Sequence, residues 1–311
     1  MAHRPTSVKS LPLKSMPALV LLNPHAQGGR AARRAPMLQH WLMQNAPHTE
    51  FAAPDSVQEA HARLRALPRG SRVVAVGGDG TLNRWLPALL DGGHALGVVP
   101  MGSGNDIARA LGVHALSLDD ALSRALRGPL RPLDVGVVEA EGLCVPFLSS
   151  LAAGFDAAVG LRALWGPRWL RGQPRYLWAT LRELAALRCW PVRLSCDGQT
   201  VWTGEVLFAS TLNTPTYGSG MPVAPQARAD DGRLEVLRAA AMGRVHVLAL
   251  LPRLLRGTHL TDPRVALQAC ISLTLDSDAA PLPVAADGEY LGQFRRLRVR
   301  VMPSALPATV A

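Results

Sequence analysis

Lysine is almost absent from this chain of 311 residues, which contains only Lys9 and Lys14. The sequence therefore has neither the Gly-Lys-Ser/Thr step of a P-loop nor the strand lysine of protein kinases, and both of these phosphoryl-transfer classes are excluded. Aromatic residues are also few, at 5% of the composition, and no basic Gly-aromatic signature of RNA-binding proteins occurs. Although the formal net charge is +10, these absences argue against nucleic acid as the partner.

Long apolar runs and patterned cysteines are missing as well. The segment that comes nearest to a membrane span, Val245 to Leu255, is interrupted by Pro252 and is shorter than the roughly 18 residues that a span needs. The four cysteines have no metal-ligand or redox spacing, and the nine histidines form no metal-ligand pair at helical spacing. Because free thiols suit a reducing compartment, we expect a soluble cytoplasmic protein without disulfides. Residues 1–15 have no continuous apolar core, so we interpret them as a flexible tail rather than a signal peptide.

The most informative segment is the run from Gly77 to Asn83, with the sequence Gly-Gly-Asp-Gly-Thr-Leu-Asn. It follows the β-branched residues 72–76, which predict a buried strand, and it leads into residues 81–90, whose apolar spacing predicts a helix. Glycines at such a turn let the backbone approach a phosphate, and the free N–H groups at a helix start favour an anion. Asp79 would repel that anion unless it holds Mg²⁺, so the run predicts a nucleoside triphosphate site with magnesium.

Two more glycine-bearing turns occupy equivalent positions. One begins at Asn23 after the predicted strand 18–22, and the other spans residues 101–106 after the predicted strand 95–100. Open parallel sheets bind ligands at their strand ends, so three such turns together outweigh the simpler interpretation of one tight turn. The run at Gly77 has neither the Gly-x-Gly-x-x-Gly pattern nor the later acidic residue of a dinucleotide-binding fold, which argues against a Rossmann dehydrogenase.

Six motifs in register extend this pattern over most of the chain. They are the three turns and the following three stretches: Asn213 with Tyr217-Gly218-Ser219-Gly220-Met221-Pro222, Ala229-Asp230-Asp231-Gly232-Arg233-Leu234, and Asp287-Gly288-Glu289. With these motifs the chain resembles lipid kinases that have a diacylglycerol-kinase-type catalytic domain, a family that includes bacterial lipid kinases and is related to sphingosine kinases. NAD kinases share the Gly-Gly-Asp-Gly-Thr motif and are the nearest alternative.

The resemblance and the local patterns predict an α/β protein of two domains. Residues 16–133 should form a three-layer parallel α/β domain that binds nucleotide, in which Ser56 and Ser117 begin helices as capping residues. Short β-rich segments predominate after residue 133, so residues 134–290 are predicted to form a mainly antiparallel β-sandwich that binds the lipid. Residues 291–311 are expected to return to the first domain as a strand.

The resemblance also implies roles for individual residues. Those implied to bind ATP are Asn23, Gly77, Gly78, Asp79, Gly80, Thr81, Leu82, Asn83, Gly102, Ser103 and Asn105. A second, structural Mg²⁺ is implied at the Asp231 carboxylate, with the main-chain carbonyls of Arg228 and Arg233 as further ligands. Glu289 is implied as the base that accepts the proton of the lipid hydroxyl, with Asp287 as a supporting metal or orienting group.

These expectations describe a kinase that transfers the γ-phosphoryl group of ATP to a lipid hydroxyl with Mg²⁺, acting from the cytoplasm at the inner membrane surface. The alternation of tryptophan and arginine over residues 161–190 favours transient contact with an anionic membrane, and a helix pair with solvated arginines is the alternative. A NAD kinase-like enzyme and a non-catalytic lipid- or nucleotide-binding regulator are the alternatives for the function, and a homodimer is an alternative to a monomer. Arg84 departs from the family, which frequently has an acidic residue there, and residues 49–55 lack a clear adenosine-side loop.

Overall fold

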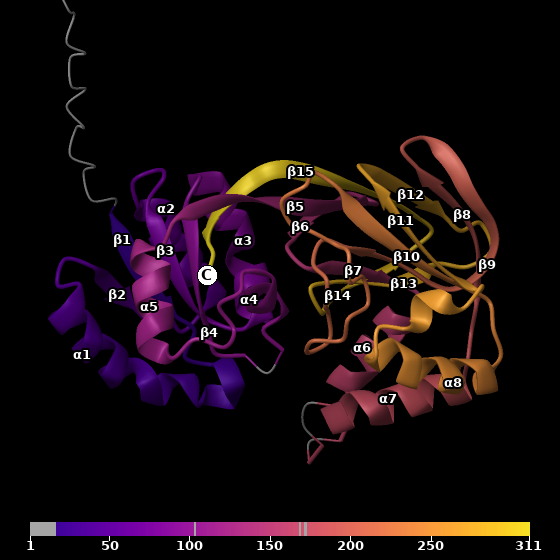
Figure 1. The fold of residues 1–311 in the computed structure, drawn as a ribbon, viewed down its shortest axis with the longest axis horizontal. Coiled ribbons are helices and arrows are strands. Elements are labelled where there is room, and N and C mark those ends of the chain that lie inside the picture. Colours follow the sequence, from indigo (N-terminus) through magenta and orange to yellow (C-terminus); the bar gives the residue numbers. More distant parts are fainter. Residues whose placement is uncertain (1–16, 103, 168, 171–172) are drawn as a thin grey trace, which may run out of the picture.

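The structure is a computed structural model that describes residues 17–102, 104–167, 169–170 and 173–311. Figure 1 shows two lobes joined by long strands along one edge. The first lobe alternates strands with helices. Its elements are β1 (Ala18–Leu22), the 3₁₀ helices η1 (Ala26–Gly29) and η2 (Ala31–Arg34), α1 (Ala35–Asn45), β2 (Glu50–Ala52), α2 (Val57–Ala66), β3 (Arg72–Gly77), α3 (Asp79–Gly92), β4 (Ala95–Pro100), α4 (Asp106–Ala110) and α5 (Leu118–Arg127).

A parallel sheet in the order β2-β1-β3-β4 forms the middle layer of this domain. Successive side chains of a strand point to opposite faces, and both faces are covered here. Val73 and Ala75 pack with α2 and α3, whereas Val74 and Val76 pack with α1 and α5. The predicted three-layer parallel α/β architecture is therefore confirmed.

Two of the helices begin at the predicted capping serines. The Ser56 hydroxyl accepts a hydrogen bond from Glu59 N at 3.1 Å, and the Ser117 hydroxyl accepts one from Asp120 N at 3.1 Å. Such bonds satisfy main-chain donors that the first turn of a helix leaves unpaired. The short polar sequences alone thus locate the starts of α2 and α5.

The second lobe is built mainly from antiparallel strands, as predicted for the second domain, with three helices on one face (Figure 1). Its elements are β5 (Leu130–Ala140), β6 (Leu143–Phe147), β7 (Ser150–Ala153), α6 (Phe155–Leu164), α7 (Gln173–Ala185), β8 (Trp190–Cys196), β9 (Gln199–Leu212), β10 (Leu234–Ala240), α8 (Arg244–Leu255), the 3₁₀ helix η3 (His259–Thr261), β11 (Val265–Cys270), β12 (Ser272–Asp276), β13 (Leu282–Ala286), β14 (Glu289–Phe294) and β15 (Arg296–Thr309). Within the described residues, none of the helices has the length and apolarity that crossing a membrane requires.

Two long strands connect the lobes. β15 pairs antiparallel with β12 through its first half and with β5 along most of its length, and Ala308 then pairs in parallel with Leu96 of β4. β5 also crosses the boundary predicted between residues 133 and 134. One hydrogen-bonded sheet therefore runs through both lobes and joins them.

Candidate active site

The glycine-rich run forms the turn between β3 and α3. Gly78 is the extended N-cap residue, and its carbonyl accepts hydrogen bonds from Thr81 N at 2.9 Å and Leu82 N at 3.2 Å. The Leu82 side chain is buried in the core, so neither its amide nor its side chain is directed to a ligand. The N–H groups of the first residues, Asp79 and Gly80, belong to the turn in which a helix lacks internal partners, and an anion binds best there.

Thr81 connects the first two turns. Its buried hydroxyl accepts a hydrogen bond from the Asn23 side-chain amide at 2.7 Å, and Asn23 N donates to Val76 O at 3.0 Å. The Asn23 side-chain oxygen Oδ1 in turn accepts from His25 N at 3.0 Å. The two residues predicted to bind ATP thus lie together, and in this structure they bind each other.

The second and third turns touch through their glycines. A Cβ atom added to Gly78 would lie 2.7 Å from the Cα of Gly102, and one added to Gly102 would lie 2.6 Å from the Cα of Gly78. Real Cβ atoms do not approach backbone so closely, so only glycine fits at both positions. Gly77 adds a further link, because its carbonyl accepts a hydrogen bond from Met101 N at 2.7 Å. The second and third turns, both predicted to bind phosphate, are therefore packed backbone against backbone.

The Asp79 carboxylate lies between these turns. It accepts hydrogen bonds from Asp106 N and Ile107 N, both at 3.1 Å, at the start of α4. Burial raises the pKa of Asp79, the bonds from Ile107 and Asp106 lower the pKa, and the nearby Asp106 charge raises it. A carboxylate oxygen has two lone pairs, so each Asp79 oxygen can still accept a further partner beside its amide bond.

Asn105 closes the third turn on itself. It has left-handed backbone with φ 56°, its side-chain oxygen accepts from Gly102 N at 2.8 Å, and its amide donates to Gly102 O at 3.0 Å. Its predicted role toward ATP is therefore accompanied by a structural one, since it holds Gly102 against Gly78. Ser103, also predicted to bind ATP, lies outside the described residues.

Asp106 is a site residue to which the sequence reasoning gave no role. It is buried, and its carboxylate accepts three hydrogen bonds from the second domain: from the Thr216 hydroxyl at 2.9 Å, Ser219 N at 2.9 Å and Gly220 N at 2.7 Å. Asp106 belongs to the 101–106 turn, and its donors Ser219 and Gly220 belong to the Tyr217–Pro222 stretch. The sequence signal that could have indicated this contact was a carboxylate in one glycine-rich motif and free main-chain N–H groups in another.

Asp287 anchors the turn by which the second domain contacts α3 of the first domain. Its carboxylate accepts from Leu148 N at 2.8 Å, Ser149 N at 2.7 Å, Ser150 N at 3.0 Å and the Asn83 amide at 3.1 Å. Burial raises the pKa of Asp287, and these bonds lower it. With four donors on two oxygens the carboxylate has little capacity left, which favours the orienting role over the metal-binding role.

Glu289, two residues later, lies over the start of α3. Its Oε1 atom is 3.4 Å from the position that a Cβ on Gly80 would occupy, and it forms an ion pair with Arg84 at 2.8 Å. Consecutive residues of α3, Asn83 and Arg84, thus hold Asp287 and Glu289. The carboxylate predicted to act as base therefore faces the predicted phosphate site from the opposite domain.

The predicted second metal site lies in the turn before β10. The Asp231 Oδ1 atom accepts from Arg233 N at 3.0 Å, and the Arg228 side chain pairs with Asp230 at 3.1 Å. Asp134 holds the same turn by accepting from Gly232 N at 2.6 Å. The described residues include no cluster of three metal-ligating side chains, so a metal here would depend on one carboxylate and main-chain carbonyls.

A further carboxylate outside the predicted site, Asp156, lies in the first turn of α6. It accepts hydrogen bonds from the Ser210 hydroxyl and from Ala157 N, and it adds to the rise in the pKa of the buried Tyr217 hydroxyl, which comes mainly from burial. Burial raises the pKa of Asp156 to about 6, against the lowering effect of the Ser210 bond. The folded protein therefore ionises Asp156 only near pH 6, well above the pH at which the unfolded chain does so, and the ionised group destabilises the fold.

We expect Asp156→Asn to increase the free energy of unfolding at pH 8 by up to about 3 kcal/mol. As pH rises, the unfolded chain loses this proton near pH 4 but the folded protein only near pH 6, so wild-type stability falls across that window. The gain should vanish near pH 4, where both states hold the proton. Urea unfolding at several pH values checks this, with Asp278→Asn, an exposed carboxylate, as control. An equal effect of Asp156→Asn at pH 4 and pH 8 would contradict it.

The fold and the contacts between its motifs together define a class of protein. A parallel α/β domain with three glycine-bearing turns faces an antiparallel β domain that contributes a carboxylate, which is the architecture of the diacylglycerol kinase and NAD kinase folds. Residues 17–138 match the diacylglycerol kinase catalytic domain family, and residues 149–310 match the YegS C-terminal NAD kinase beta sandwich-like domain. The chain therefore belongs to the diacylglycerol kinase family of lipid kinases, as its motifs predicted.

Individual relatives agree with this assignment. A diacylglycerol kinase of Mycobacterium tuberculosis is 30% identical over 277 residues, which cover 87% of each chain. A Pseudomonas aeruginosa protein named "probable lipid kinase YegS-like" is 33% identical, over 78% of this chain and 77% of its own. The crystal structure of a diacylglycerol kinase from Bacillus anthracis superimposes with a TM-score of 0.71 at 17% identity, covering 96% of this chain and 98% of that chain. The last similarity establishes the fold.

Proposed function

We propose that this lipid kinase transfers the γ-phosphoryl group of ATP to a hydroxyl group of a diacylglycerol-like lipid. The observation that carries the proposal is the position of Glu289, whose Oε1 atom is 3.4 Å from the Cβ position of Gly80 at the start of α3. A base in one domain thereby faces a phosphate-binding turn in the other, and the acceptor hydroxyl would lie between them.

The phosphates would bind at the first turn of α3, on the N–H groups of Asp79 and Gly80. Asp79 is the carboxylate best placed to hold Mg²⁺, because each of its oxygens accepts one amide bond and has a lone pair left. One protein carboxylate is sufficient, since Mg²⁺ in kinases is bound largely by substrate phosphates and water. When bound, the ion would neutralise charge on the phosphates. A second Mg²⁺ at Asp231 stays a prediction.

In the reaction, the oxygen of the lipid hydroxyl forms a bond to the γ-phosphorus as the bond between that phosphorus and the bridging oxygen of ADP breaks. The hydroxyl proton passes to the Glu289 carboxylate. Asp287 fixes the turn that carries Glu289, and Arg84 holds the Glu289 carboxylate by its charge. The chain's own residues thus position the base while the nucleotide supplies the phosphoryl group.

Support for a lipid acceptor comes from the relatives, which are named diacylglycerol kinase and probable lipid kinase. An acceptor embedded in a bilayer implies that the protein acts at a membrane surface, and the proposed location is the cytoplasmic side. The net charge of +10 suits an anionic surface.

The test is transfer of labelled γ-phosphate from ATP, with and without Mg²⁺, to diacylglycerol, other lipid alcohols and NAD. We expect label on one class of lipid only in the presence of Mg²⁺, and its loss in Asp79→Asn. Asp91→Asn, an exposed carboxylate just before the end of the same helix, is the matched control and should retain activity. Label on NAD alone would move the function to the NAD kinases, and ATP binding without transfer to any acceptor would favour a regulator.

A further inference from the structure

Three helices of the second domain present apolar side chains to the outside. Among the described residues, nine of the thirteen large hydrophobic side chains that are exposed lie on or between α6, α7 and α8. They are Leu164, Trp165, Trp169, Tyr176, Leu177, Leu181, Val245, Leu248 and Leu255. We call this surface the α6–α8 face; Arg168 and Arg171, which the sequence also places in this region, lie outside the described residues.

The spacing of these residues shows that the helices expose whole stripes rather than single side chains. On α8, Val245 and Leu248 are exposed, while Val247 and Leu250 are buried beneath them. On α7, the exposed Leu177 and Leu181 are four residues apart and so share one side of the helix. A helix that packs on a sheet normally places polar residues on its outer side, so outward apolar stripes on adjacent helices indicate a partner.

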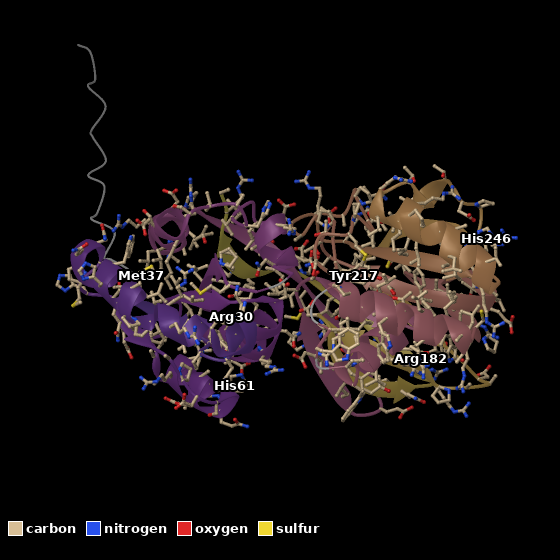
Figure 2. All side chains as sticks on the ribbon, turned by 90° about the horizontal axis from the view of Figure 1, so that it is seen from below. Arg30, Met37, His61, Arg182, Tyr217 and His246 are labelled. Carbon is tan, nitrogen blue, oxygen red and sulfur yellow. The ribbon has the colours of Figure 1, made fainter. Side chains whose placement is uncertain are left out.

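The helices are fixed to one another and form one surface. Arg162 of α6 pairs with Glu183 of α7, and the Arg175 guanidinium donates to Gly166 O at 2.8 Å in the connection between them. Arg244, at the start of α8, donates to Leu184 O at 3.1 Å and Ala185 O at 3.2 Å at the end of α7. Figure 1 shows α7 and α8 on the lower side of the second lobe, and Figure 2, seen from below, shows them side by side, with Arg182 of α7 and His246 of α8 labelled.

The charge on this face is positive. From residue 157 to residue 196 the only acidic residue is Glu183, and residues 244–261 contain none. Glu183 is neutralised by Arg162, and the buried Asp262 beside the face is neutralised by Arg253 and accepts from His246. Among the described residues, no carboxylate forms an ion pair with Arg182, Arg188 or Arg256. Figure 2 labels Arg182, which lies on α7. Arginine beside exposed tryptophan is the combination that suits the headgroup region of a bilayer.

The start of α7 is the part of this face that lies toward the predicted active site. Tyr176, near the start of α7, is about half exposed. Partial burial of the Tyr176 side chain raises the pKa of its hydroxyl. The positive charge of the adjacent Arg175 lowers this pKa, and the negative charges of Asp106 and Glu289 raise it. The charges of Asp106 and Glu289 thus reach the Tyr176 hydroxyl, so the start of α7 lies on the side of the second lobe that faces the predicted active site.

We propose that the α6–α8 face docks on the surface of an anionic lipid bilayer, with its tryptophans and leucines in the headgroup region and its arginines on lipid phosphates. Docking in this orientation would present bilayer lipid to the proposed active site at Glu289. The proposal names the surface by which the proposed lipid kinase reaches its acceptor, and to that extent it rests on the proposed function.

The test is co-sedimentation of the full chain with vesicles of phosphatidylcholine, alone or mixed with phosphatidylglycerol. We expect binding only to the mixed vesicles, weaker binding as salt rises, and at least about tenfold weaker partition for Leu177→Glu/Leu181→Glu and for Val245→Glu. Met43→Glu on α1, where the side chain is 67% exposed, makes the same chemical change on the other lobe and should not weaken binding. Equal loss in Met43→Glu, or no loss in the α6–α8 variants, would overturn the proposal.

A second measurement separates docking from catalysis. Transfer to a short-chain diacylglycerol dissolved as monomers should persist in the α6–α8 variants, while transfer to long-chain diacylglycerol in mixed vesicles falls. Loss of vesicle binding in a protein that phosphorylates no acceptor would support docking and contradict the proposed function. Sedimentation velocity tests whether a second copy of the chain, rather than a bilayer, covers this face. If the wild type is a dimer, the α6–α8 variants are monomers and vesicle binding is unchanged, the face belongs to a second copy and the proposal is overturned.

Discussion

Glu289→Gln is expected to lower kcat for lipid phosphorylation by about 10²- to 10⁴-fold, the usual contribution of a general base. Glutamine keeps the size of the side chain and its position over Gly80, but it cannot accept the hydroxyl proton. Because the phosphate-binding turns and Asp79 are untouched, KM for ATP should change little. Steady-state kinetics with saturating lipid acceptor measure both parameters, and a wild-type kcat in this variant would mean that another group accepts the proton.

Arg84 provides the control for this experiment. Its ion pair with Glu289 is about half exposed, and pairs of that kind contribute at most about 1 kcal/mol. Arg84→Ala should therefore reduce kcat by no more than about fivefold, and Arg84→Lys, which retains the charge, should recover most of the loss. A collapse of activity in Arg84→Ala as large as that in Glu289→Gln would instead place Arg84 at the transferred phosphoryl group.

Gly102→Ala is expected to weaken ATP binding by about ten- to a hundredfold and to lower the free energy of unfolding by about 1–3 kcal/mol, the range for an inserted methyl group in a packed site. The added Cβ would lie 2.6 Å from Gly78 Cα and equally close to the Asn105 side-chain oxygen. Backbone cannot move aside as a flexible side chain can, so the two turns must separate. Isothermal titration with a non-hydrolysable ATP analogue and urea unfolding measure the two effects.

Gly160→Ala is the matched substitution. Gly160 lies within α6, and a Cβ there would meet nothing within 4 Å. Because alanine is favoured over glycine in helices, this change should stabilise the protein by up to about 1 kcal/mol and leave ATP binding intact. Similar ATP affinities for Gly102→Ala and the wild type would show that close contact between the turns is not needed for nucleotide binding.

Much of the fold follows from local sequence. The strands at residues 18–22, 72–77 and 95–100 lie where apolar, β-branched runs predict them, because a strand buried on both faces needs such a run. Other strands have no such signal. β2 has three residues, β13 contains Pro283, and β14 contains Gly292 and alternates weakly, so these strands exist through their partners rather than through propensity.

The candidate site likewise has features that the local sequence predicts and features that it does not. The spacing of glycines indicates where a phosphate can approach, and the Asp-Gly pair at 287–288 forms the hairpin turn expected of it, with positive φ at both residues. The directions of the carboxylates could not be predicted, because they depend on pairings across the fold. Asp79 accepts bonds from the start of α4, and Arg84 meets Glu289 across a sequence separation of 205 residues. Side chains so far apart in the chain are placed by the sheet, not by their neighbours in sequence.

The pairing of β15 with β4 has a consequence for the order of folding during synthesis. The parallel sheet of the first domain gains its last neighbour only when Ala308 meets Leu96, which emerges from the ribosome more than 200 residues earlier. Contacts of such long range form slowly, and unpaired strand edges are prone to aggregate. The nucleotide-binding domain, although first in the chain, is thus completed last, and until then β4 exposes an edge that a chaperone or another nascent chain can occupy.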